Sequence, residues 1–248
     1  MIKYYTLYLI PQIIHYCWFG KGPKDTKTLH CIQTWKKILP DYQIIEWNES
    51  NFPIEESGIY VREAYRLHKY AFVSDVARMY ALYTQGGIYL DTDIEVLKSF
   101  TPYLHHRSFI GYEIQNRPGT GVIGSEKGVS WIKEMLTYYQ KHHFIQNNGK
   151  QSCTNVDILL NLLTQKGIIL DGQKQECFNE LILYPYDFFC AKDCSTGLKQ
   201  VTQRTVCIHD YAATWKDNRK KDLSFPSKLL FEIKYRIHNY FIRFTTKK

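Results

Sequence analysis

The sequence lacks the arrangement of cysteines that a disulfide framework needs. Its seven cysteines are odd in number and scattered, and none of them forms a Cys-x-x-Cys pair. Disulfide-rich scaffolds carry an even number of cysteines at regular spacings, whereas isolated cysteines are typical of reduced cytosolic proteins. We therefore expect free thiols and a cytoplasmic protein.

Patterns for a membrane-spanning segment and a signal peptide are also missing. No run approaches the roughly 20 apolar residues that a spanning helix needs. Residues 1–11 contain neither a long apolar region nor a small-residue cleavage site. Internal repeats and low-complexity tracts are absent as well. The chain has 248 residues, of which 44% are hydrophobic and 23% charged, and this predicts a soluble globular protein with a real core.

The body of the chain has almost no excess of one charge sign. The formal net charge is +8, but residues 216–248 hold ten Lys or Arg and three Asp or Glu, which accounts for +7. An enzyme that acts on nucleic acid usually spreads its basic residues over the body of the fold. We therefore expect no nucleic-acid partner.

The basic tail predicts an amphipathic helix over residues 227–244. Its apolar face comprises Leu230, Ile233, Ile237, Phe241 and Phe244. Two interpretations stay open: the helix packs on the body, or it attaches the protein peripherally to an anionic surface at the inner face of the membrane. We accordingly divide the chain into a domain over 1–222 and a basic amphipathic C-terminal helix over 223–248.

The beginning of the chain predicts a strand–helix–strand unit. Strands over 11–19 and 42–47 flank a helix over 25–39 with one apolar side. Such a unit is typical of a parallel sheet, so we expect an α/β fold with a mainly parallel central sheet flanked by helices. Further helices are expected over 59–68, 129–141 and 155–166, further strands over 94–97, 108–113, 122–123, 182–189 and 205–209, and loops over 48–58, 115–121 and 142–154.

Residues 70–95 are the most informative stretch. They begin as a helix that carries Asp75 and Arg78, which are three residues apart and so leave the helix on nearly the same side. Gly86 and Gly87 end the helix where a positive φ is easiest. A three-residue apolar strand, Ile-Tyr-Leu, follows directly. An acid and a base on a helix that leads into a buried strand predict a polar site at the end of that strand.

Two carboxylates, Asp91 and Asp93, close the strand. Alternation along an extended chain would place both side chains on one side, with Thr92 opposite. Paired carboxylates suit a hard divalent cation, Mg²⁺ or Mn²⁺, which takes oxygen ligands and commonly shares them with phosphates. Most isolated Asp-x-Asp triplets are surface turns, but the position after Gly-Gly and an apolar strand favours a metal site here.

These residues resemble the DXD region of glycosyltransferase family 32. The matching motif is Ser74-Asp75-x-x-Arg78 followed by Gly86-Gly87-Ile-Tyr-Leu-Asp91-x-Asp93. The resemblance extends to Ile-Pro-Gln-Ile-Ile-His-Tyr-Cys-Trp-Phe-Gly over 10–20 and to Ile-His-Asp-Tyr-Ala-Ala-Thr-Trp over 208–215. The family includes yeast-type initiating mannosyltransferases and bacterial capsular polysaccharide transferases. The spacing is also similar to that of the glucosyltransferase domain of large clostridial toxins.

The resemblance implies a GT-A fold, a nucleotide-sugar donor, a divalent metal and retention of the anomeric configuration. It implies that Asp93 is the main metal ligand and that Asp91 contacts the donor and shares the metal. Ser74, Asp75 and Arg78 would bind the donor sugar. The catalytic residues would thus be Asp75, Arg78, Asp91 and Asp93. A surface ion pair is the alternative for Asp75 with Arg78.

Four further side chains complete the implied donor and metal site. Trp18 would stack on the base, with plain core packing as the alternative. Trp215, next to Thr214, would donate its indole N–H to a diphosphate oxygen. His209 would complete the metal shell, since neutral imidazole binds Mn²⁺; the alternative is a buried polar histidine. Departures from the family are Asp210-Tyr211 in place of the usual His-Trp, and the absence of an aligned Asn in 119–124.

The resemblance implies transfer of a sugar, expected to come from a UDP-sugar, to a glycan or lipid-linked saccharide in polysaccharide biosynthesis. A haloacid-dehalogenase-type phosphatase also places Asp-x-Asp after an apolar strand, but such enzymes have this strand near the start of the chain. A carbohydrate-binding or scaffold protein with a degenerate transferase fold is the non-enzymatic alternative.

Overall fold

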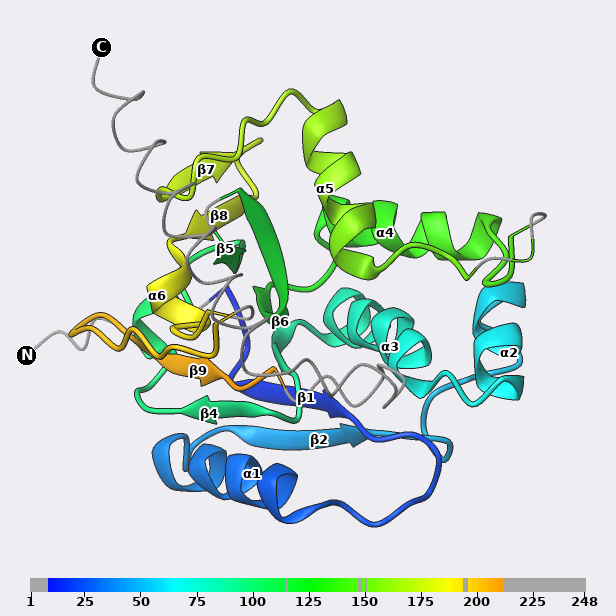
Figure 1. Cartoon of the computed structure of the whole chain (residues 1–248), viewed down its shortest axis with the longest axis horizontal. Coiled ribbons are helices and arrows are strands. Elements are labelled where there is room, and N and C mark those ends of the chain that lie inside the picture. Colours follow the sequence, from blue (N-terminus) through cyan, green and yellow to red (C-terminus); the bar gives the residue numbers. More distant parts are fainter. Residues whose placement is uncertain (1–8, 115, 147–148, 150, 194–195, 212–248) are drawn as a thin grey trace, which may run out of the picture.

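The computed structural model describes residues 9–114, 116–146, 149, 151–193 and 196–211 (Figure 1). Its strands are β1 (Ile13–Cys17), β2 (Gln43–Trp47), β3 (Gly87–Leu90), β4 (Ile94–Val96), β5 (Ser108–Ile114), β6 (Arg117–Ser125), β7 (Gln175–Cys177), β8 (Leu181–Tyr184) and β9 (Cys207–His209). Its helices are α1 (Thr26–Ile38), α2 (Ile59–Arg66), α3 (Tyr70–Gln85), α4 (Ser130–Lys141), α5 (Asn155–Gln165), α6 (Tyr186–Phe189) and a 3₁₀ turn (Thr101–Tyr103).

A seven-stranded sheet in the order β2-β1-β3-β6-β5-β8-β7 forms the centre of the molecule. β1 pairs in parallel with β2 and β3, and β5 pairs in parallel with β8. β6 runs antiparallel between β3 and β5, and β7 runs antiparallel to β8. Five of the seven strands therefore point the same way. This confirms the predicted α/β class with a mainly parallel sheet, as expected for a GT-A fold.

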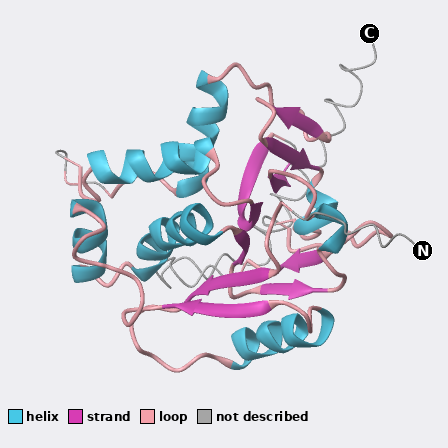
Figure 2. Cartoon of the chain, turned by 180° about the vertical axis from the view of Figure 1, so that it is seen from behind, coloured by secondary structure: helices cyan, strands magenta, loops and turns pink. Residues whose placement is uncertain are grey.

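Helices cover both faces of this sheet (Figures 1 and 2). One hydrophobic cluster joins the sheet to α2, α3, α4 and α5. A second cluster on the other face joins it to α1, α6 and the two-stranded β4–β9 sheet. Helix α3 is buried almost all round, because it is enclosed by the sheet and by neighbouring helices. The charged residues of α3, Asp75 and Arg78, therefore lie in the interior.

The glycine pair after α3 is required by close backbone packing. Gly86 and Gly87 have φ values of 71° and 113°, which disfavour any other residue. A Cβ on Gly87 would lie 2.7 Å from the carbonyl oxygen of Ile13. The chain can thus leave α3 and pair directly with β1, which sets the position of β3 and of the acidic residues after it.

Two predicted segments were wrong. Residues 117–121 belong to the central strand β6, because the small residues there let β6 pair closely with β5 despite Pro118 and several glycines. The strand predicted over 182–189 is too long. Strand β8 ends at Tyr184, and Pro185 is the N-cap of the short helix α6. Strand β7 was not predicted, since three residues carry too little pattern.

Some predictions lie outside the described residues. These are the C-terminal helix over 223–248, together with Thr214 and Trp215. Among the described helices, none is long and apolar enough to cross a membrane. The six cysteines in the described part of the chain are all free thiols.

Candidate active site

A cleft of about 1010 Å³ opens at one end of the sheet. The carboxyl ends of β1, β3 and β5 meet there, as does the beginning of the antiparallel strand β6. The N-terminal parts of α1, α3 and α5 complete the walls. Ligands of open α/β sheets bind beyond the carboxyl ends of the strands, so this cleft is the natural candidate site.

Asp91 and Asp93 lie in the cleft, but a turn rather than strand alternation brings them together. Strand β3 ends at Leu90, and the N–H of Ile94 donates to the carbonyl of Asp91 at 3.0 Å. The N–H of Asp91 donates to the carbonyl of Gly121 at 2.8 Å, which holds the turn against β6. The predicted extended geometry was therefore wrong, because the chain turns as soon as β3 ends.

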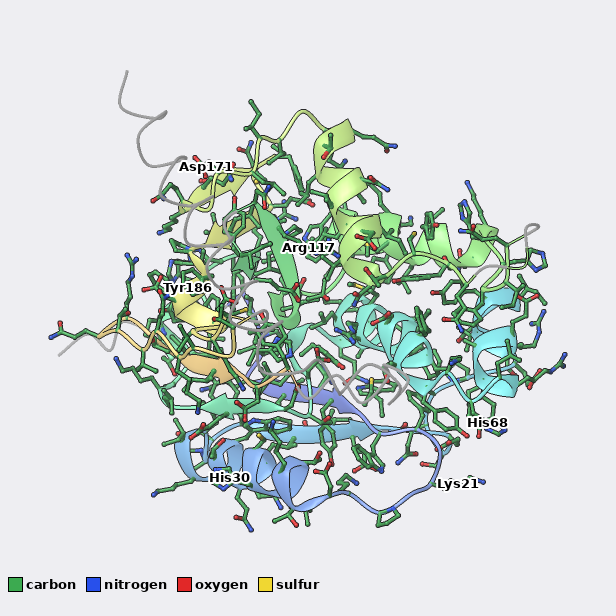
Figure 3. The ribbon with its side chains drawn as sticks, in the orientation of Figure 1. Lys21, His30, His68, Arg117, Asp171 and Tyr186 are labelled. Carbon is green, nitrogen blue, oxygen red and sulfur yellow. The ribbon has the colours of Figure 1, made fainter. Side chains whose placement is uncertain are left out.

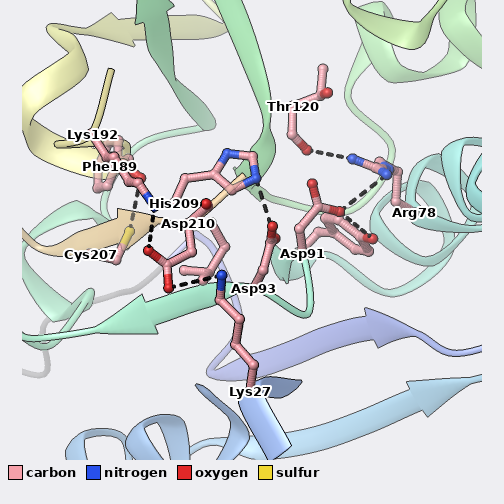
Figure 4. Close-up of polar contacts among 12 residues, drawn as sticks. Lys27, Arg78, Asp91, Asp93, Thr120, Phe189, Lys192, Cys207, His209 and Asp210 are labelled. Carbon is pink, nitrogen blue, oxygen red and sulfur yellow. Dashed lines mark hydrogen bonds and ion pairs between the residues drawn. The ribbon is translucent and has the colours of Figure 1, made fainter. Parts of the chain in front are cut away.

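His209 joins the two carboxylates although it lies more than a hundred residues further along the chain. Strand β9 pairs with β4, and this pairing places His209 opposite Ile94. The His209 Nε2 lies 3.3 Å from Asp93 Oδ1 (Figure 4). One ligand atom from each of Asp91, Asp93 and His209 can be chosen so that all three lie within 4.8 Å of one another. The structure thus brings the predicted metal ligands together.

Neighbouring residues hold this cluster in place. A Cβ on Gly121 would lie 2.9 Å from His209 Cε1 and 3.1 Å from Asp91 Oδ2, so the missing side chain makes room for both. Tyr211 stacks on the His209 ring with centroids 4.0 Å apart. The N–H of Asp210 donates to the Asp93 carbonyl at 3.0 Å, and its carboxylate pairs with Lys27 and Lys192 (Figure 4).

The donor atoms of the cluster fit a hard divalent cation. Two carboxylates and an imidazole are ligands that Mn²⁺ accepts, and carboxylates also suit Mg²⁺. The buried Nδ1 of His209 has no hydrogen-bond partner among the described residues. Burial lowers the pKa of His209, but the contributions of Asp93 and Cys190 more than compensate, and the pKa is raised well above its usual value. The carboxylates of Asp91 and Asp93 are the negative charges that a cation at this cluster would neutralise.

Asp75 and Arg78 form a buried pair beside the cluster, which excludes the surface ion pair. Arg78 Nη2 lies 2.9 Å from Asp75 Oδ1 and 3.2 Å from Asp91 Oδ1. Its Nη1 donates to the carbonyl of Thr120 at 2.8 Å (Figure 4). Burial raises the pKa of Asp75 to about 7, although Arg78 acts to lower it. Arg78 thus connects the helix to the Asp91 turn and to β6.

Tyr89 and Asn155 also contribute to the site, and the sequence analysis did not identify them. The Tyr89 hydroxyl donates to Asp91 Oδ1 at 2.9 Å, and its ring lies 4.5 Å from the Arg78 guanidinium carbon. The Asn155 amide donates to Asp75 Oδ1 at 2.7 Å from the start of α5. Tyr89 stands inside the recognised motif and could have been noticed, whereas only the fold brings Asn155 to Asp75.

Trp18 and Ser74 line the cleft, as expected. Both were predicted to contact a donor, and within the protein their side chains make the following contacts. Trp18 is half-buried just after β1, and its indole N–H donates to the Gly22 carbonyl at 2.7 Å. The Lys24 ammonium lies 5.4 Å from its ring. The Ser74 hydroxyl donates to the Tyr70 carbonyl at 3.0 Å. Trp18 is therefore part of the cleft wall and not a fully buried core residue.

Comparisons with known proteins agree with this site. Residues 25–110 match the family described as "glycosyltransferase sugar-binding region containing DXD motif". Inositol phosphoceramide mannosyltransferase 3 of Schizosaccharomyces pombe is 26% identical over 130 residues, which are 51% of this chain and 36% of that protein. The chain thus matches only about a third of the length of this relative.

Two solved glycosyltransferase structures match this chain in part. PaToxG glycosyltransferase has a TM-score of 0.49 and 22% identity, over 63% of this chain and 69% of that one. The galactosyltransferase LgtC, in complex with donor and acceptor sugar analogues, has a TM-score of 0.44 and 12% identity, over 89% of this chain and 94% of that one.

The family match covers the segment that contains Asp75, Arg78, Asp91 and Asp93. It thereby confirms the resemblance predicted from the sequence: residues 25–110 are similar to glycosyltransferase sugar-binding regions of the DXD type.

Proposed function

We propose that the protein is a retaining, metal-dependent glycosyltransferase that uses a nucleotide-sugar donor. The observation that carries this proposal is the juxtaposition of two sites in one cleft. The Asp91–Asp93–His209 cluster suits a cation, and the buried Asp75–Arg78–Asn155 network beside it offers groups that bind hydroxyls. A diphosphate and a sugar are joined in the donor, so one ligand would contact both.

The donor would lie along the cleft from Trp18 to Asp75. Trp18 is half-buried in the wall of the cleft. Its aromatic face is suited to stack on a base. Asp75 and Asn155 can accept and donate hydrogen bonds to sugar hydroxyls. Arg78, shared between Asp75 and Asp91, would keep both carboxylates oriented toward the ligand. A UDP-sugar is the donor class that we propose.

Sugar transfer requires stabilisation of the departing diphosphate. A divalent cation held by Asp91, Asp93 and His209 would supply charge neutralisation for that leaving group. The chain's own residues would hold the sugar fixed through Asp75 and Asn155, because correct positioning accounts for much of the rate enhancement. An acceptor hydroxyl on the same face as the leaving group gives retention, and the departing phosphate oxygen takes its proton. This scheme requires no carboxylate nucleophile.

The acceptor is proposed to be a glycan or lipid-linked saccharide in polysaccharide biosynthesis. The proposal that residues 223–248 attach the protein to a membrane surface rests on their sequence pattern alone.

The decisive experiment is a panel of UDP- and GDP-sugars with and without Mn²⁺, scored by release of nucleoside diphosphate. We expect release with one donor in Mn²⁺, and little with EDTA. Asp93→Asn should reduce the rate by on the order of 100-fold or more, since it removes charge stabilisation of the leaving group.

Glu95→Gln is the matched control for Asp93→Asn. Glu95 lies two residues further along in β4, and its carboxylate faces Lys199 at 3.8 Å. This variant should retain the activity of the unaltered protein. If no donor releases nucleoside diphosphate, the proposal is contradicted, and a carbohydrate-binding protein with a degenerate transferase fold is favoured.

A further inference from the structure

The cleft has a second wall that the proposed donor site does not use. It consists of the end of β5, the beginning of β6 and the residues that flank the donor-site Asn155 at the start of α5; its residues are Glu113, Ile114, Arg117, Thr154 and Val156. Figure 3 shows Arg117 between β6 and α5, well away from Lys21 in the loop after β1 and from His68, which lines the cleft just before α3. This wall therefore lies across the cleft from the segment that carries Trp18.

Glu113 is the chemically distinctive residue of this wall. Its side chain is only 17% exposed, yet no described residue donates a hydrogen bond to its carboxylate. Its nearest cationic atom is Arg117 Nε, at 4.0 Å, which is the limit of an ion pair. A partly buried carboxylate to which no described residue donates gains from a donor supplied by a ligand, because lost hydration is then compensated. Glu113 thus offers an unused acceptor to the cleft.

Small residues in β6 place Glu113 close to the metal-ligand cluster. A Cβ on Gly119 would lie 3.0 Å from Glu113 Cγ, and a Cβ on Gly121 would contact His209 and Asp91. Gly119 thus makes room for Glu113, and Gly121, two residues further along the same strand, makes room for His209 and Asp91. Burial raises the pKa of Glu113, and the charges of His209 and Arg117 act to lower it, which agrees with this proximity.

The charge of the wall indicates which ligands it would accept. Arg117 Nη2 is paired with Asp157 Oδ1 at 2.9 Å, so its positive charge is already balanced. Glu113 is a further negative group beside Asp91 and Asp93. An anionic ligand would therefore be repelled, whereas a neutral hydroxyl can donate to Glu113 without any charge penalty.

From these contacts we infer that the Glu113 wall is the acceptor subsite and that it binds a neutral saccharide, whose hydroxyl donates a hydrogen bond to Glu113. This inference rests on the proposed transferase function. It assigns the acceptor to the side of the metal-ligand cluster opposite Trp18, within reach of the sugar held by Asp75. It also predicts discrimination against acceptors that carry a phosphate next to the reacting hydroxyl.

The test separates donor use from acceptor use. Donor hydrolysis is measured without acceptor, and transfer is measured with neutral methyl glycosides and with the same glycosides carrying a phosphate. Glu113→Ala should raise the acceptor KM about tenfold and reduce donor hydrolysis far less than it reduces transfer, because a hydrogen bond to a charged group contributes about 1.5 kcal/mol or more. Glu113→Gln keeps a carbonyl acceptor and should raise the KM less. Neutral glycosides should be preferred over phosphorylated ones.

Glu126→Gln, beyond the other end of β6 where Glu126 pairs with Arg107, is the matched control and should leave both reactions unchanged. Equal losses of hydrolysis and transfer in Glu113→Ala would place Glu113 in the donor site and overturn the inference. So would an unchanged acceptor KM, or neutral glycosides that neither accept sugar nor inhibit hydrolysis. If the unaltered protein hydrolyses no donor, the proposed function itself fails, and the acceptor subsite with it.

Discussion

His15 in the central sheet and His209 in the β4–β9 sheet are both buried, but their surroundings are opposite. His15 lies in β1, where its Nε2 is 2.7 Å from the Gly86 carbonyl and the Trp47 indole donates to its Nδ1 at 3.1 Å. Because an indole N–H can only donate, Nε2 must carry the proton and the ring is neutral. His209 faces the carboxylate of Asp93, and its buried Nδ1 has no partner among the described residues.

The pKa directions of these histidines follow from those partners. Burial lowers the pKa of His15 to about 4, with the Gly86 hydrogen bond acting in the other direction. For His209 the contributions of Asp93 and Cys190 outweigh burial, and the pKa rises. Burial alone therefore does not distinguish a structural histidine from a candidate ligand. What distinguishes them is whether the ring nitrogens are satisfied by the protein itself.

The largest expected difference between the two histidines is in metal binding. His209→Ala should weaken Mn²⁺ binding by on the order of 100-fold, since even outer-shell partners of a metal ligand contribute 10- to 100-fold. His15→Gln should bind Mn²⁺ as the unaltered protein does. Isothermal titration calorimetry of metal-free protein measures both affinities. Equal affinities for the two variants would remove the distinction between ligand and structural histidine.

A second difference concerns stability in the absence of metal. His15→Phe leaves the Trp47 indole N–H and the Gly86 carbonyl without their partner, and each unsatisfied group costs about 1–3 kcal/mol. Urea denaturation should therefore show a larger loss for His15→Phe than for His209→Phe. The opposite order would mean that His209 is the structural residue and would contradict its assignment to the metal site.

A third expected effect is on the pH dependence of stability. The folded protein keeps His15 neutral down to about pH 4, whereas the unfolded chain binds a proton near pH 6.5. The contribution of His15 is thus fully present above pH 6.5 and is lost as the pH falls toward 4. The difference between the two pKa values corresponds to roughly 3 kcal/mol. Urea denaturation at a series of pH values from 7 to 4 should show a free energy of unfolding that falls less steeply for His15→Phe than for the unaltered protein. The same slope in both would exclude His15 as the source of the pH dependence.

The sequence predicted the part of the site that local patterns encode. The helix with Asp75 and Arg78, the glycine break and the strand before Asp91 are contiguous, so periodicity and turn residues suffice to place them. His209 was a candidate only because of the family resemblance. No local pattern shows that β9 would pair with β4 and bring His209 to Asp93.

The rest of the site depends on pairings between distant segments. Residues 117–121 contain Pro and Gly, which single-sequence patterns assign to loops, yet tertiary packing makes them the start of a central strand. Glu113 and Asn155 belong to the cleft only because of that strand and of α5. They could not be predicted from composition, because each lies in the cleft only through packing against residues far away in the chain.

Gly121 shows how a residue without a side chain constrains this protein. Its backbone carbonyl anchors the Asp91 turn, and the space above its Cα is filled by His209 and Asp91. Even a methyl group would push these two apart, although Gly121 offers no functional group of its own. A mutational scan should therefore rank Gly121 among the intolerant positions, and Gly121→Ala would supply an inactive protein in which every candidate ligand is still present.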